Sequence, residues 1–161
     1  MITIDNLIVT GTTRLLGSAY FPADCVGDLQ VKGDAAVQTV KQVHKHRKAY
    51  GQSGTAASVT IPIHVVNGVT ATVISLKAGT IAPCTGNATI TIDLKKNGTT
   101  AISAVITLDS ANTARVVEAA TITVPAGAVG DFYELVVVAT AGSGGLGTGL
   151  LVELEIDEAA A

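Results

Sequence analysis

Histidine is the residue type in this chain best suited to binding a metal ion. His44 and His46 are two positions apart, so an extended backbone would place both imidazoles on one face. A closed metal site needs a third or fourth ligand, and nothing in the sequence brings His64 close to this pair. We therefore expect solvated histidines, with no metal ion and no cofactor.

The other reactive groups form no recognisable catalytic set. Cys25 and Cys84 lie far apart without a CxxC partner, so we expect free thiols, although a disulfide between them is left open. The glycine-rich stretch 142–147 lacks the lysine and the following helix of a phosphate-binding loop. The sequence contains no GxSxG or HExxH motif, and its carboxylates are scattered. These features predict that the protein is not an enzyme.

Basic side chains concentrate in one short segment. Lys41, Lys45, Arg47 and Lys48 are four of the ten basic residues of the chain. Such a segment could bind nucleic acid, stay solvated, or dock onto an acidic surface of a partner protein. The net charge of −3 and the lack of interleaved aromatic residues make nucleic acid the weakest of these interpretations.

The composition suits one domain whose surface is partly covered by protein. The 161-residue chain is 48% hydrophobic and only 14% charged, against roughly 25% charged in an average domain. No apolar run approaches the ~18 residues needed to cross a bilayer, so we expect other protein chains, and not a membrane, to cover this surface. The first residues lack the pattern of a signal peptide, which favours synthesis in a cytoplasm.

The elements that must hold these side chains are β-strands, because apolar residues beyond residue 56 recur with period two. Ile90, Ile92 and Leu94 share one face, and Asn97-Gly98 then supplies a tight hairpin turn. The same alternation predicts seven strands: Ser58–Val66, Val69–Leu76, Ala88–Lys95, Ala101–Leu108, Arg115–Val124, Phe132–Thr140 and Thr148–Asp157. The expected fold is all-β, an antiparallel β-sandwich over residues 56–161 that is jelly-roll-like or of another Greek-key order.

The first 55 residues are predicted to form an extended N-terminal arm. It should contain short strands and, from the weak helical spacing of Val37, Val40 and His44, a short helix over residues 35–48. The arm is too short to bury its own apolar side chains, so these should pack on the sandwich or on another chain. They are Ile4, Leu7, Val9, Leu15 and Leu16.

One predicted strand is apolar on both of its faces. Residues 135–139 (Leu-Val-Val-Val-Ala) follow one another without a polar break, whereas a strand of a sandwich meets the core with one face only. The second face should therefore lie under the arm or in a contact between subunits. Val136 and Val138 are its candidate residues.

Two parts of the chain resemble proteins of tailed bacteriophages. Residues 7–17 (Leu-Ile-Val-Thr-Gly-Thr-Thr-Arg-Leu-Leu-Gly) resemble the lead-ins of virion structural proteins. Residues 84–98 and 126–135 look like the jelly-roll domain of phage head cement or decoration proteins, and the similarity covers most of the chain. The resemblance implies a homotrimer on the capsid surface of a virion assembled in the host cytoplasm, where it stabilises the head. Its partner would be the major capsid protein, held through the arm, the basic segment and the two valines.

Phage fibre and tail-tip proteins have similar sandwiches, which leaves a second function open. A fibre or tail-tip module would bind a glycan on the host surface and would need exposed aromatic or acidic loop residues. Tyr20, Tyr50 and Tyr133 are the only tyrosines available for that role.

Overall fold

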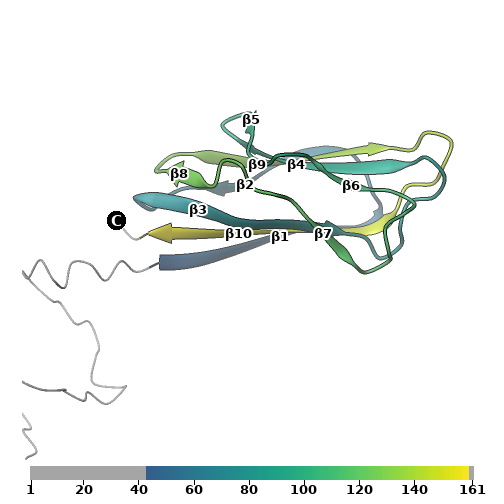
Figure 1. The fold of residues 1–161 in the computed structure, drawn as a ribbon, viewed down its shortest axis with the longest axis horizontal. Coiled ribbons are helices and arrows are strands. Elements are labelled where there is room, and N and C mark those ends of the chain that lie inside the picture. The colour runs from purple at the N-terminus through teal and green to yellow at the C-terminus, as the bar shows by residue number, and fades with distance from the viewer. Residues whose placement is uncertain (1–42, 160–161) are drawn as a thin grey trace, which may run out of the picture. The chain divides into compact units, whose positions relative to one another are not determined.

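The computed structural model describes residues 43–159, which form two antiparallel β-sheets packed face to face (Figure 1). Sheet A has the order β1-β10-β3-β7, with β8 also paired to β3, and sheet B has the order β2-β9-β4-β5, with β6 also paired to β4. The strands are β1 Val43–Thr55, β2 Val59–Val65, β3 Thr70–Gly79, β4 Thr89–Lys96, β5 Thr99–Thr100, β6 Ile106–Leu108, β7 Val117–Ala119, β8 Ala126–Ala128, β9 Phe132–Thr140 and β10 Thr148–Ala159. Among these residues no helix is long and apolar enough to cross a membrane.

The strand order is that of a jelly roll. When β5 with β6, and β7 with β8, are each counted as pieces of one interrupted strand, both sheets have four strands. The chain then passes repeatedly from one sheet to the other, as two Greek keys require. The predicted all-β sandwich is thus confirmed.

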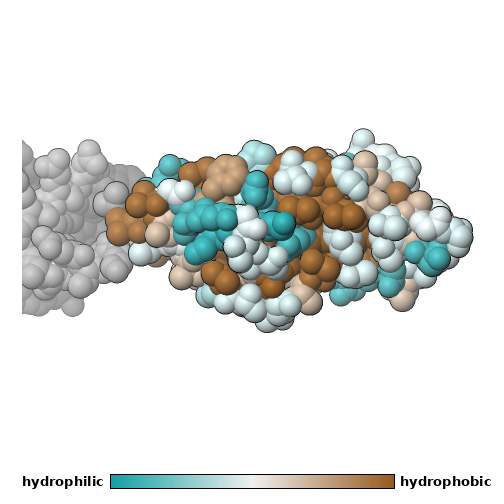
Figure 2. Space-filling view, turned by 90° about the horizontal axis from the view of Figure 1, so that it is seen from above, coloured by the Kyte–Doolittle hydropathy of each residue, from teal (hydrophilic) through white to brown (hydrophobic). Residues whose placement is uncertain are grey.

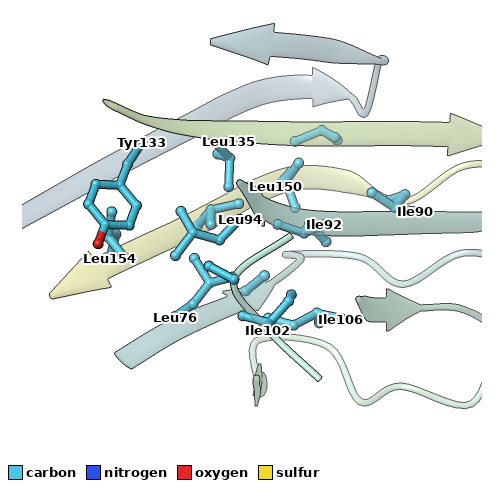
Figure 3. Close-up of a cluster of buried hydrophobic side chains, with 14 of the residues drawn as sticks. Leu76, Ile90, Ile92, Leu94, Ile102, Ile106, Tyr133, Leu135, Leu150 and Leu154 are labelled. Carbon is cyan, nitrogen blue, oxygen red and sulfur yellow. The ribbon is translucent and has the colours of Figure 1, made fainter. Parts of the chain in front are cut away.

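The core lies between the two sheets and consists almost entirely of aliphatic side chains. Figure 3 shows side chains from both sheets pointing into this space, among them Leu76 and Leu154 of sheet A and Ile92 and Leu135 of sheet B. Tyr133 is the one aromatic residue in this buried cluster. Each fully buried Leu, Ile or Val contributes about 1.5–3 kcal/mol to folding, so the strands need no aromatic packing to hold the sheets together.

Most predicted strands and the predicted turn are confirmed. β9 has the predicted bounds, and Asn97 and Gly98, at φ 50° and 81°, close the turn between β4 and β5. The predicted strands 101–108 and 115–124 are shorter in the structure, where only Ile106–Leu108 and Val117–Ala119 form strands there. The physical reason is that residues 101–103 and 121–124 hydrogen-bond to one another, with the Ser103 N–H donating to the Thr121 carbonyl and the Thr123 N–H to the Ala101 carbonyl, which interrupts both ladders.

The start of the sandwich differs from the prediction. Residues 43–55 form β1, an edge strand of sheet A that pairs with β10 from Val43↔Ala159 to Thr55↔Thr148. Residues 43–48 are therefore strand and not the predicted helix, while residues 35–42 lie outside the described residues. Half-buried and exposed residues alternate along β1, because an edge strand over a core turns every second side chain inward.

Candidate functional site

Two histidines and one glutamate lie together at one edge of the sandwich, where β1 is the outermost strand of sheet A and β2 is the outermost strand of sheet B. His46 comes from β1, His64 from β2 and Glu158 from the end of β10. His64 Nε2 is hydrogen-bonded to Glu158 Oε1, His46 Nε2 lies 3.9 Å from Glu158 Oε2, and the two imidazole centroids are 5.2 Å apart. We call these three residues the edge cluster. It links sheet A to sheet B.

The register of β10 directs Glu158 into the protein. Val152, Leu154 and Ile156 face the core, and Glu158 continues their period-two series, with only 5% of its surface exposed. Its Oε2 accepts hydrogen bonds from the Gly68 N–H at 2.8 Å and the Asn67 N–H at 3.3 Å. A Cβ on Gly68 would lie 2.3 Å from the Ala159 carbonyl oxygen, so glycine permits this close approach. A buried carboxylate is costly unless it is hydrogen-bonded in this way.

The hydrogen bonds and the charge of His64 lower the pKa of Glu158 by more than burial raises it. Burial raises the pKa of Glu158, but the N–H of Gly68, the hydrogen bond and charge of His64 and the N–H of Asn67 bring the pKa below its ordinary value. Nearby, Tyr133 lies opposite His64 in the β2–β9 ladder. Burial and the charge of Asp131 raise the pKa of Tyr133, and its buried hydroxyl has no hydrogen-bond partner among residues 43–159.

The edge cluster is arranged as a structural link. Beside it lies an open hollow of about 350 Å³, lined by His46, Lys48, His64 and Asn67 among others. Within residues 43–159 no group of three or more His, Cys, Asp or Glu side chains could hold a metal ion. His64 Nε2 and both Glu158 oxygens already have hydrogen-bond partners, so the cluster holds β1, β2 and β10 together.

The predicted basic cluster is divided between the two faces of β1. Lys45 and Arg47 face outward, where Lys45 Nζ lies 3.5 Å from both Glu155 and Asp157, and Arg47 Nε lies 3.6 Å from Glu155. Lys48 falls on the other face and lines the hollow beside the edge cluster. Lys41 lies outside the described residues. The acidic side chains of β10 therefore neutralise part of the charge that the sequence places in one segment.

The two candidate valines both lie on the outer face of sheet B. Leu135 and Val137 are 0% and 1% exposed and face the core, whereas Val136 is half-buried and Val138 is 46% exposed. Figure 2 looks onto this side of the sandwich and shows apolar groups set among polar ones. No described residue buries Val138, so its role in a protein contact stays a prediction.

The remaining predicted residues fall outside the site or outside the described part of the chain. Ile4, Leu7, Val9, Leu15 and Leu16, like Cys25, lie outside the described residues. Cys84 is buried, donates to the Leu108 carbonyl at 3.5 Å and accepts from the Gly147 N–H at 3.3 Å. The glycine-rich connection packs against the loop before β4, since a Cβ on Gly144 would lie 1.8 Å from the Thr85 carbonyl oxygen.

Glu158 is the functional-site candidate that the sequence analysis missed. The predicted last strand ended at Asp157, whereas β10 continues to Ala159. Extending the alternation of Val152, Leu154 and Ile156 by one step would have placed Glu158 on the core side. An acidic residue at a core position is a signal that a partner must be close.

Comparison with known proteins identifies no family. No protein-family model matches the chain, and no curated protein matches it. Among solved structures, one of turnip yellow mosaic virus matches with 9% identity and a TM-score of 0.36, covering 74% of this chain and 94% of the other. The C-terminal domain of EclA, described as a sugar-binding protein, matches with 21% identity and a TM-score of 0.35, covering 84% and 89%. Both TM-scores are too low to support a conclusion about this chain.

Proposed function

We propose that this chain is a non-enzymatic structural protein of a virus particle, specifically a homotrimeric cement protein that binds the outer surface of a tailed-phage head and stabilises it. The proposed partner is the major capsid protein, and neither nucleic acid nor a membrane is involved. The jelly-roll topology agrees with the family that the sequence resembles, although a fold does not by itself define a function.

The observation that carries the proposal is the exposed apolar surface of a sandwich with few charges. Among residues 43–159, twelve large apolar side chains are between 36% and 68% exposed. Scattered apolar residues are normal on a protein surface, but here several of them line the same hollows. Such surface is usually covered in an assembly. The twelve are Val43, Val65, Val69, Ile74, Ile81, Val105, Val116, Val117, Val124, Val129, Val138 and Leu151.

The glycan-binding alternative loses support from the positions of the tyrosines. Sugar modules use exposed aromatic faces with a few placed polar groups. Tyr133 is completely buried, and Tyr50 is half-buried with its hydroxyl accepting a hydrogen bond from Gln52 at 2.9 Å. Tyr20 lies outside the described residues. The two tyrosines within residues 43–159 therefore give no support to this second function.

The test is to restore the protein to virus particles that lack it. Purified protein carrying a C-terminal label should co-sediment with such particles, and negative-stain images should show the label over the whole head. Val138→Asp should weaken co-sedimentation, whereas Thr72→Asp, at an exposed polar position on β3 of the other sheet, should not. Label confined to the tail end would favour the fibre alternative, and no co-sedimentation at all would contradict both functions.

A further inference from the structure

Leu151 stands between two apolar hollows on the outer face of sheet A. Gly51 of β1, Leu151 of β10 and Gly79 of β3 are direct cross-strand partners in one row, so their outward positions adjoin. Leu151 is a ridge, 48% exposed: Gly51 has no side chain beside it, and on the other side Gly79 is buried, where a Cβ would lie 2.7 Å from the Val116 carbonyl oxygen. The hollow on the Gly79 side has a volume of about 230 Å³ and is also lined by Ile81 and Val117, and the hollow on the Gly51 side has about 450 Å³.

The next row along the same two strands carries opposite charges. Glu153 of β10 is the cross-strand partner of Lys77 of β3, two residues along from Leu151 and Gly79. Lys77 is exposed and Glu153 is half-buried. Among residues 43–159 neither side chain belongs to an ion pair. On this face β10 therefore carries the protruding Leu151 and the acidic Glu153. The neighbouring strand β3 carries the hollow beside Gly79 and the basic Lys77.

We propose that this face is a two-fold contact between two copies of the chain. A two-fold axis parallel to the strands and midway between β10 and β3 exchanges the positions of these two strands. It places Leu151 of each copy at the hollow beside Gly79 of the other, and Glu153 of each copy opposite Lys77 of the other. The strands of the two stacked sheets then run nearly parallel or antiparallel, which is the common aligned mode of sheet packing.

Charge complementarity identifies the occupant as a second copy. A single two-fold operation places Leu151 of each copy at the hollow of the other and pairs Glu153 of each copy with Lys77 of the other, as an isologous contact requires. Charge pairs of this kind fix register and select the partner more than they add affinity. The apolar ridge supplies most of the affinity. The contact does not depend on a viral role, and with a trimer it would join trimers in pairs.

The first experiment removes the ridge. Sedimentation velocity of the full chain should show a concentration-dependent species containing an even number of copies. Leu151→Asp should raise the dissociation constant by about ten-fold or more, while Val105→Asp, at a similarly exposed site beside the other sheet, should leave it unchanged. Circular dichroism should show that both variants stay folded. A monomer, or a trimer that Leu151→Asp does not affect, would overturn the proposal.

The second experiment tests the orientation of the contact. Glu153→Lys alone and Lys77→Glu alone each place like charges opposite one another in the homodimer, so each should associate more weakly than the natural chain. A mixture of the two variants should form heterodimers, because every crossed pair then has opposite charges. Within each variant chain, positions 153 and 77 carry like charges, and mixing does not change this. Stronger association in the mixture can therefore come only from contacts between copies. Mixtures that associate no better than the separate variants would contradict the two-fold arrangement.

Discussion

His64 of β2 and Glu158 of β10 form a buried hydrogen bond that joins sheet B to sheet A at the edge of the sandwich. Both side chains are less than 10% exposed. The same carboxylate accepts the backbone N–H groups of Asn67 and Gly68 in the loop between β2 and β3. One titratable group of β10 thus holds the edge strand β2 and the loop that follows it.

The lowered pKa of Glu158 predicts a loss of stability in acid. Because the folded-state pKa lies below the ordinary value of 4.5, the ionised carboxylate stabilises the folded protein at pH values above that ordinary value. This contribution should disappear as the pH falls from 4.5 through the folded-state pKa. Urea denaturation at a series of pH values would measure the decline.

Glu158→Gln is the control for this pH dependence. The amide keeps the shape of the side chain but cannot ionise, so the variant should be less stable at pH 7 by about 1–3 kcal/mol. Its free energy of unfolding should also change less with pH in the same window. An acid-induced decline equal to that of the natural chain would assign the effect to other carboxylates.

The two faces of β9 predict opposite results for neighbouring substitutions. Val137 is 1% exposed and Val138 is 46% exposed. Val137→Asp should destabilise the domain by about 3 kcal/mol or more, because the charge has no partner in the core. Val138→Asp should remain folded with a melting temperature close to that of the natural chain. Thermal unfolding followed by circular dichroism would compare them, and two folded variants would show that the assignment of the faces is wrong.

Zinc and chelators are expected to leave the melting temperature unchanged. The edge cluster brings His46 and His64 together, but His64 Nε2 is already bound to Glu158 and no metal-holding group exists within residues 43–159. Metal binding would stabilise the folded state by mass action if a site were present. Differential scanning fluorimetry with stoichiometric zinc, repeated on His46→Ala, is the measurement. A rise of several degrees that His46→Ala abolishes would reveal a site.

The position of β1 predicts where the chain can be shortened. A variant that begins at Val43 keeps every described strand and should unfold cooperatively. A variant that begins at Ala56, the first residue of the sandwich predicted from sequence, loses the whole of β1 and leaves β10 as an unprotected edge. We expect this second variant to aggregate or to fail to unfold cooperatively. Equal stability of the two variants in urea would show that β1 contributes nothing to the fold.

The amino-acid sequence by itself determined the local features of this protein. The alternation of Ile90, Ile92 and Leu94 located β4, and Asn97-Gly98 located the turn that follows it. Strand period and positive φ are properties of a few neighbouring residues, so they can be recognised without knowledge of the fold. The same reasoning located β9 but could not say whether its outward valines are covered.

Only the tertiary structure decided which distant segments meet. The residues around His44 have helical spacing but form a strand, because they pair with the open edge of β10. This pairing brings Lys45 to Glu155, which lies 110 residues further along the sequence. His64 and Glu158 are 94 residues apart and come together because β2 and β10 end on the same side of the sandwich. Strand pairing depends on which edges remain free and on which faces need burial. These are properties of the assembled sheets, and no local pattern of residues contains them.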